Sequence, residues 1–102
     1  AILSQVKAKR AVRLNVSGAF HSPLMANAAT EFKEVLESVT FSDAAVPVLS
    51  NVDPVPAVDA NLLKQRLTQQ MTGAVRWREL QDELPKQGIE QVIEIGPGKV
   101  LT

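Results

Sequence analysis

Two hydrophobic periods alternate along this chain, and their alternation limits the folds open to it. Apolar residues recur at three- and four-residue steps along 23–39, the period of an amphipathic helix whose first turn Ser22 and Pro23 suit. Apolar and polar residues instead alternate along 11–16, the period of a half-buried strand. Strands that alternate with helices predict an α/β fold in which the helices pack around a largely parallel sheet.

The middle of the chain continues this alternation. We expect a short strand at 46–52, a surface loop at 53–58, and helices at about 60–71 and 75–87. Pro47 places the strand near a sheet edge or lies at the start of the strand, because proline cannot donate to a ladder. Asp59 can cap the helix that follows. The side chains expected to face the core from the two helices are Leu62, Leu63, Leu67, Met71, Trp77, Leu80 and Leu84.

The two ends of the chain predict an incomplete fold. Residues 1–8 have the composition of the last turns of a helix, and no starter methionine precedes them. Residues 91–95 predict a third strand, which a glycine turn at 96–98 joins to the opening of a helix at 99–102. That helix would be cut after one turn, where it should pack on the sheet. We therefore expect the sequence to be a window cut from a bigger fold.

Composition excludes several classes of function. The 102 residues suffice for one small domain with a core, and the absence of cysteine excludes a disulfide scaffold, a thiolate zinc site and a cysteine nucleophile. The 11 basic and 11 acidic side chains give zero net charge, which argues against a nucleic-acid-binding surface. No apolar run approaches the ~18 residues of a membrane span, and no secretory signal pattern opens the chain. We expect a cytoplasmic protein, which fits the lack of disulfides.

His21 is the only histidine, and it lies in a small-residue loop between a predicted strand and a predicted helix. Such loops gather catalytic groups in α/β folds, and a neutral imidazole can take a proton from a hydroxyl. In an unknown domain, however, a lone histidine more often caps or packs, and a metal site is not expected without cysteine. None of the serines lies in Gly-x-Ser-x-Gly, the turn that exposes a nucleophilic hydroxyl. The chain therefore has a candidate base without a nucleophile.

The remaining polar features have simple interpretations. The turn Gly96-Pro97-Gly98 could bring backbone amides toward an anion, but a tight turn into a helix explains it better. Trp77 is interpreted as a core anchor. The arginines do not cluster, so each is interpreted as a solvated side chain or a surface ion pair: Arg10, Arg13, Arg66, Arg76 and Arg78.

Four blocks of sequence are more specific than these single residues. They are 17–25 (SGAFHSPLM), 47–53 (PVLSNVD), 70–77 (QMTGAVRW) and 94–101 (EIGPGKVL). In this order they resemble the histidine loop, a later strand, a glutamine-to-tryptophan segment and the late glycine turn of malonyl-CoA:acyl carrier protein transacylases. The acyltransferase domains of fatty-acid and polyketide synthases are similar. The resemblance covers nearly the whole chain.

The resemblance implies an enzyme of fatty-acid biosynthesis. In such an enzyme a serine takes malonyl from malonyl-CoA and passes it to the phosphopantetheine thiol of acyl carrier protein, with no metal or cofactor. Residues 17–102 would be the C-terminal part of an α/β-hydrolase-like acyltransferase domain, and 1–16 the tail of a ferredoxin-like subdomain. His21 matches the catalytic histidine, and Gln70 matches the residue whose backbone carbonyl orients it. Phe20 matches the bulky residue of malonyl-selective members.

Three parts of the family's machinery do not occur in this sequence. They are the Gly-His-Ser-x-Gly elbow, the arginine that pairs with the malonyl carboxylate, and the glutamine-glycine oxyanion loop. The resemblance therefore implies that the chain needs a further N-terminal part, and that alone it is inactive. The alternative is a non-catalytic α/β binding module, which predicts a stable monomer that His21→Ala leaves unchanged. A nucleic-acid-binding domain is disfavoured by the zero net charge.

Overall fold

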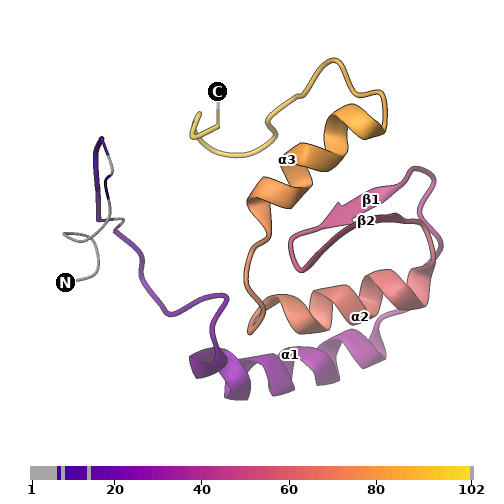
Figure 1. Ribbon diagram of the computed structural model, residues 1–102. Helices are drawn as coiled ribbons and strands as arrows, with labels where there is room; N and C mark the ends of the chain where they lie inside the picture. Colours follow the sequence, from indigo (N-terminus) through magenta and orange to yellow (C-terminus); the bar gives the residue numbers. More distant parts are fainter. Residues whose placement is uncertain (1–6, 8, 14, 102) are drawn as a thin grey trace.

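The computed structural model describes residues 7, 9–13 and 15–101, so the helix predicted over 1–8 falls almost entirely outside the described residues. The described elements follow in the order 3₁₀ helix Pro23–Met25, α1 Ala26–Ser38, β1 Val48–Ser50, β2 Asp53–Ala57, α2 Ala60–Gln70 and α3 Trp77–Lys86. Helices α1 and α2 lie side by side, a two-stranded sheet lies against α2, and α3 lies at the other side of the sheet (Figure 1). The described part is thus a small α/β piece.

The predicted helix over 23–39 is confirmed, with a tight first turn. Pro23 opens the 3₁₀ turn at its first position, and α1 continues to Ser38. Ser22 precedes the helix as predicted, but its side chain does not cap it. The Ser22 hydroxyl donates to the carbonyl of Ala19 at 2.6 Å and bonds no helical amide. Leu36 is buried at 6% exposure and belongs to the face of α1 that packs against α2.

The prediction of a largely parallel sheet is wrong for the described residues. β1 and β2 pair antiparallel, with Val48 opposite Ala57 and Ser50 opposite Asp53, and they form a two-stranded sheet. The residues 53–58, predicted as a loop, therefore contain a strand. Its two prolines misled the prediction, because an edge strand tolerates proline wherever its backbone nitrogen faces away from the ladder. A tight turn joins the strands, which is a connection open only to antiparallel neighbours.

Helix α2 begins as predicted but buries a different side chain. The Asp59 carboxylate accepts from the amide of Leu62 at 2.7 Å, which is the predicted cap. The predicted core positions Leu62 and Leu67 are 38% and 36% exposed, whereas Arg66 is 4% exposed. The interpretation of Arg66 as a surface residue is therefore wrong, and the hairpin supplies the partners that make its burial tolerable.

Helix α3 combines one correct core prediction with one incorrect one. Leu80 is buried at 7% exposure as predicted, but Trp77 is 45% exposed and does not anchor the core of the described residues. Arg76 forms the surface ion pair expected of it, with Glu79 as its partner. The helix tolerates Pro85 in its last turn, and Gly88 follows with φ +73°, the left-handed conformation that ends helices.

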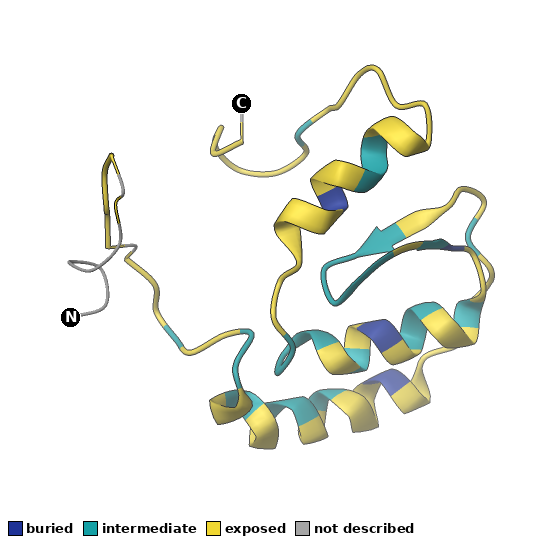
Figure 2. Ribbon diagram, viewed as in Figure 1, coloured by how far each residue is buried: buried dark blue, intermediate teal, exposed yellow. Residues whose placement is uncertain are grey.

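The strands predicted over 11–16 and 91–95 are not strands in the described residues. Val12 and Val16 are 61% and 68% exposed, and Ile93 and Ile95 are 83% and 93% exposed (Figure 2). A strand forms only where a neighbour satisfies its backbone groups, and no such neighbour lies beside either stretch among the described residues. The helix expected to open at 99 is likewise absent from 99–101.

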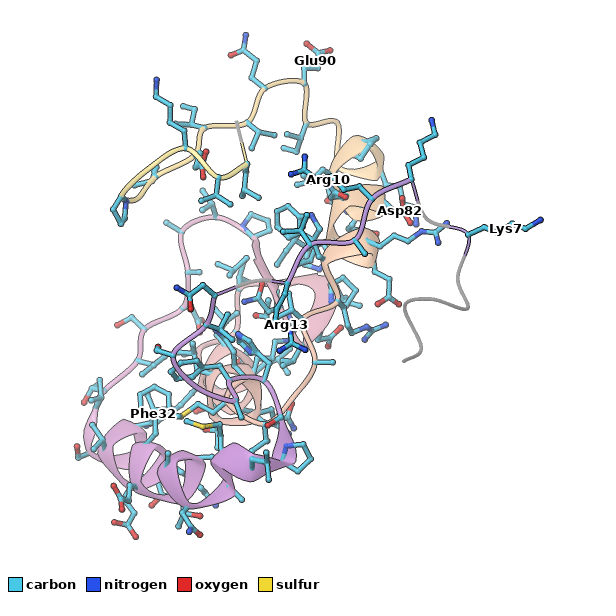
Figure 3. The ribbon with its side chains drawn as sticks, turned by 90° about the vertical axis from the view of Figure 1, so that its left-hand side faces the viewer. Lys7, Arg10, Arg13, Phe32, Asp82 and Glu90 are labelled. Carbon is cyan, nitrogen blue, oxygen red and sulfur yellow. The ribbon has the colours of Figure 1, made fainter. Side chains whose placement is uncertain are left out.

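The core is smaller than the length of the chain led us to expect. Only Leu36, Ala57 and Leu80 are buried apolar residues in the described part. The radius of gyration is 16.3 Å, against about 13 Å for a compact domain of this length. Residues 9–13 extend away from the helices, and Lys7 and Glu90 point outward from the body (Figure 3). Among the described residues, no helix has the length and apolar character needed to cross a membrane.

Candidate active site

The backbone of His21 adopts an unusual conformation that a hydrogen bond stabilises. Its φ is +61°, which is uncommon for a residue other than glycine, although histidine tolerates it better than bulky or branched residues. The His21 amide donates to the carbonyl of Met71 at 3.0 Å, which ties the loop before α1 to the end of α2. Two segments about fifty residues apart in the sequence are thereby joined at the histidine.

The imidazole of His21 makes a second bond to the same helix end. Its Nδ1 lies 2.9 Å from the carbonyl oxygen of Gln70. A carbonyl can only accept, so this contact is a hydrogen bond when Nδ1 carries the proton. A neutral ring in that tautomer leaves Nε2 unprotonated and able to accept a proton. The structure therefore brings His21 and Gln70 together in an arrangement suited to a general base.

The C-terminus of α2 explains why these carbonyls are free to bind the histidine. The last four carbonyls of an α-helix have no partner within the helix. The carbonyl of Gln69 accepts from the amide of Gly73 at 2.9 Å, while those of Gln70 and Met71 accept from the ring and the amide of His21. The end of α2 thus supplies both acceptors for His21 from its own unpaired carbonyls.

A cavity of about 430 Å³ opens beside the imidazole. Its lining is mostly apolar and consists of Phe20, His21, Phe32, Leu67, Gln70 and Met71. Phe32 points from α1 toward α2 (Figure 3), whereas Phe20 is 55% exposed at the cavity's edge. An apolar hollow next to one polar group that can accept a proton is the usual composition of a small-molecule site.

The turn of the hairpin packs against the segment that follows α2. A Cβ atom added to Gly73 would lie 2.8 Å from Cγ1 of Val52, so the backbone after α2 packs directly on the hairpin turn. The amide of Arg76 donates to the carbonyl of Asn51 at 2.8 Å and fixes the next part of the same segment. The side chain of Val52 and a main-chain hydrogen bond thus hold the residues that follow the two histidine-binding carbonyls.

No second reacting group is evident among the described residues. The Ser22 hydroxyl is bonded to the carbonyl of Ala19, and no cluster of three potential metal ligands is found in the described part. At the late glycine turn, the amides of Val100 and Leu101 both donate to the Glu94 carboxylate at 3.1 Å, so these amides are occupied. The interpretation of this region as a turn rather than an anion site agrees with that contact.

Sequence reasoning missed the carbonyl of Met71, the contact between Gly73 and Val52, and the buried Arg66. The first is a main-chain atom, which no residue type signals. A glycine three residues after a helix suggested only a helix stop, and nothing local to Arg66 indicated that a hairpin would fold over it.

The described fold and site define a small α/β segment that presents a histidine, held by the end of α2, to an apolar cavity. No family model matches the chain. Over all 102 residues, however, the chain is 56% identical to a malonyl CoA-acyl carrier protein transacylase of Synechocystis sp., of which it covers 35%. The chain is thus homologous, over its whole length, to about a third of the length of the curated transacylases that it matches.

Solved structures agree with this comparison. The crystal structure of Synechocystis malonyl-CoA:ACP transacylase superposes on 98% of the chain with a TM-score of 0.87 at 55% identity, and 34% of that protein is covered. A malonyl-transacylase bound to its type II polyketide acyl carrier protein gives a TM-score of 0.85 at 39% identity, over 96% of this chain and 32% of that one. The homologues of this chain are therefore acyltransferases.

Proposed function

We propose that this chain supplies the histidine base for transfer of a malonyl group from malonyl-CoA to the phosphopantetheine thiol of acyl carrier protein. The observation that carries the proposal is the hydrogen bond between His21 Nδ1 and the Gln70 carbonyl. Similarity to named malonyl transacylases over the whole chain supports the substrate and the carrier.

In this reaction His21 moves one proton in each half. Nε2 takes the proton of a serine hydroxyl as its oxygen attacks the malonyl thioester carbonyl, and then protonates the departing thiolate of coenzyme A. In the second half Nε2 takes the proton of the carrier's thiol, the sulfur attacks the acyl-serine, and the proton returns to the serine oxygen. The carbonyl of Gln70 accepts from Nδ1 throughout, so that Nε2 is the nitrogen that takes and returns the proton.

The serine and the group that binds the malonyl carboxylate would come from a part of the protein outside this sequence, which contains no Gly-x-Ser-x-Gly. On this proposal the 102-residue chain transfers no malonyl by itself. Residues 17–102 would form the C-terminal part of the large acyltransferase subdomain, and 1–16 the end of a ferredoxin-like one.

Phe20 would limit the size of the acyl group. It directly precedes His21 and lines the same cavity. On this proposal its phenyl ring would occupy space that an α-methyl branch needs. Discrimination against one added methyl group in an apolar pocket is modest, about 1–3 kcal/mol. Phe20→Ala should therefore admit methylmalonyl groups while leaving the base in place.

The proposal is tested by placing this chain in a complete enzyme. The matching segment of the Synechocystis transacylase would be replaced by residues 1–102, and malonyl transfer to acyl carrier protein would be measured. The chimera should be active, and His21→Ala should lower kcat by about 10²-fold or more, because positioned proton transfer contributes that much. Asn61→Ala, at an exposed position of α2, serves as the control and should leave the rate unchanged.

Two outcomes would refute the proposal. A folded chimera without activity would favour the non-catalytic binding module. A chimera whose rate survives His21→Ala would show that another group acts as the base.

A further inference from the structure

Arg66 is the most deeply buried polar side chain in the described part of the protein, with 4% exposure. It extends from α2 to the hairpin, where Nη1 donates to the carbonyl of Val55 at 2.7 Å and Nη2 donates to the Asp53 carboxylate at 2.8 Å. Its Nε is also buried and has no partner among the described residues. The fork geometry of the guanidinium allows this one side chain to form hydrogen bonds with strand β2 at two residues.

The ion pair is half-buried, since the side chain of Arg66 is 4% exposed and that of Asp53 is 38% exposed, and such a pair adds little net stability to a fold. Taking a guanidinium out of water costs several kcal/mol, and its partners offset that cost only when they are correctly placed. The apolar contacts around it are non-directional and would tolerate a small shift of α2 along the hairpin. The two short hydrogen bonds of Arg66 would not tolerate such a shift.

Arg66 lies one helical turn before Gln70, whose carbonyl binds the histidine ring. After Gln70 and Met71, the chain is attached to the hairpin again, through the packing of Gly73 on Val52 and the bond from the Arg76 amide. The two histidine-binding carbonyls therefore lie between two attachments to the same hairpin. Helix ends fray unless such contacts restrain them, so each attachment limits how far these carbonyls can move.

We propose that Arg66, through its bonds to β2, is a positioning residue that keeps the carbonyls of Gln70 and Met71 aligned on His21. This inference rests on the proposed role of His21 as the base. The hydrogen bonds of Arg66 go to β2 and not to the imidazole. It acts through the helix that ends at the histidine.

The state of the ring can be measured directly in this chain. Because His21 is the only histidine, its ¹⁵N ring signals need no assignment. At pH 9, where an imidazole is neutral, the wild-type chain should hold the proton on Nδ1. Arg66→Met should increase the share of the Nε2–H tautomer, because a displaced Gln70 carbonyl no longer selects Nδ1–H. Arg78→Met, at an exposed position of α3, is the matched control and should leave the tautomer unchanged.

Kinetics of the same variants in the Synechocystis chimera give an independent measurement. Arg66→Met should lower kcat about tenfold or more with the KM for malonyl-CoA within about twofold, because misplacing a catalytic group by ~1 Å can cost up to 10²-fold. Arg66→Lys should recover part of the loss, since an ammonium group keeps the charge but not the fork. Asp53→Asn, which keeps the shape of one partner, replaces Arg66→Met if that variant does not fold.

The outcomes separate this inference from the proposed function. Lower kcat together with a changed tautomer supports positioning. A lower unfolding midpoint with unchanged tautomer and unchanged kcat per folded molecule would show that Arg66 only stabilises the fold, which overturns the inference. If the unmodified chimera transfers no malonyl, the proposed function fails, and the tautomer of the 102-residue chain alone decides whether Arg66 positions the ring.

Discussion

Gly73→Ala should change the free energy of unfolding in two opposing ways, because Gly73 packs against Val52. The φ of Gly73 does not lie in the left-handed region, so alanine could adopt this backbone conformation, and the stiffer unfolded chain would add about 0.4–1 kcal/mol of stability. The new Cβ, however, would lie 2.8 Å from Cγ1 of Val52 and 2.9 Å from the carbonyl oxygen of Gln69. Carbon atoms normally pack at about 3.5–4.0 Å, so the segment must move by several tenths of an ångström.

Overpacking of this kind costs about 1–3 kcal/mol, which exceeds the gain from the unfolded state. We expect Gly73→Ala to lower the free energy of unfolding by about 1–2 kcal/mol in urea titrations. Val52→Ala combined with Gly73→Ala should lose less than the sum of the single changes, because the double variant lacks Cγ1. A Gly73→Ala chain as stable as the wild type would refute this reasoning, and strictly additive effects would show that Val52 is not the obstacle.

Three further substitutions test separate contacts. Asp59→Ala removes the acceptor for the Leu62 amide and should lower the free energy of unfolding by about 1 kcal/mol in the same titrations. Gln70→Ala keeps the main-chain carbonyl and should leave the tautomer of the histidine ring unchanged by ¹⁵N NMR. The hydrogen bond from Arg76 lowers the pKa of Glu79 below its ordinary 4.5. The Arg76–Glu79 pair therefore stabilises the fold at pH values above 4.5, the pKa of Glu79 in the unfolded chain. This stabilisation is lost as the pH falls through the lower pKa of Glu79 in the folded protein. Glu79→Gln should be less stable than the wild type at pH 7 but not at the acidic end of a pH series.

The sequence predicted the features that depend on neighbours along the chain. The helices around 23–39 and 60–71 have a clear 3.6-residue period, and Asp59 has the side chain and the position of a cap. The pairing of His21 with Gln70 was expected only from the family resemblance, because no local pattern relates residues 49 positions apart.

The errors concern contacts across the chain. An arginine in a polar helix gave no sign that β2 would cover it, and the prolines that suggested a loop lie instead in a strand with one neighbour. The stretch 91–95 is rich in β-branched residues, which is typical of a strand. A strand requires a partner for its hydrogen bonds, however, and none lies beside this stretch among the described residues. The hydrophobic period of a sequence predicts which face of a helix or strand is apolar. Whether a strand forms also depends on a neighbouring strand that can pair with it.

The way His21 is held suggests why the surrounding fold matters more than any single neighbouring side chain. Both groups that bind it are main-chain carbonyls at the end of α2, and any residue type could supply them. Their positions depend on where α2 ends and on how that end lies against the hairpin. On the proposal made above, residues remote from the imidazole determine the geometry of His21, namely Arg66 in its half-buried ion pair and Gly73, which packs against the hairpin turn. Substitutions there should alter the ring's tautomer more than a change in the side chain whose carbonyl it binds.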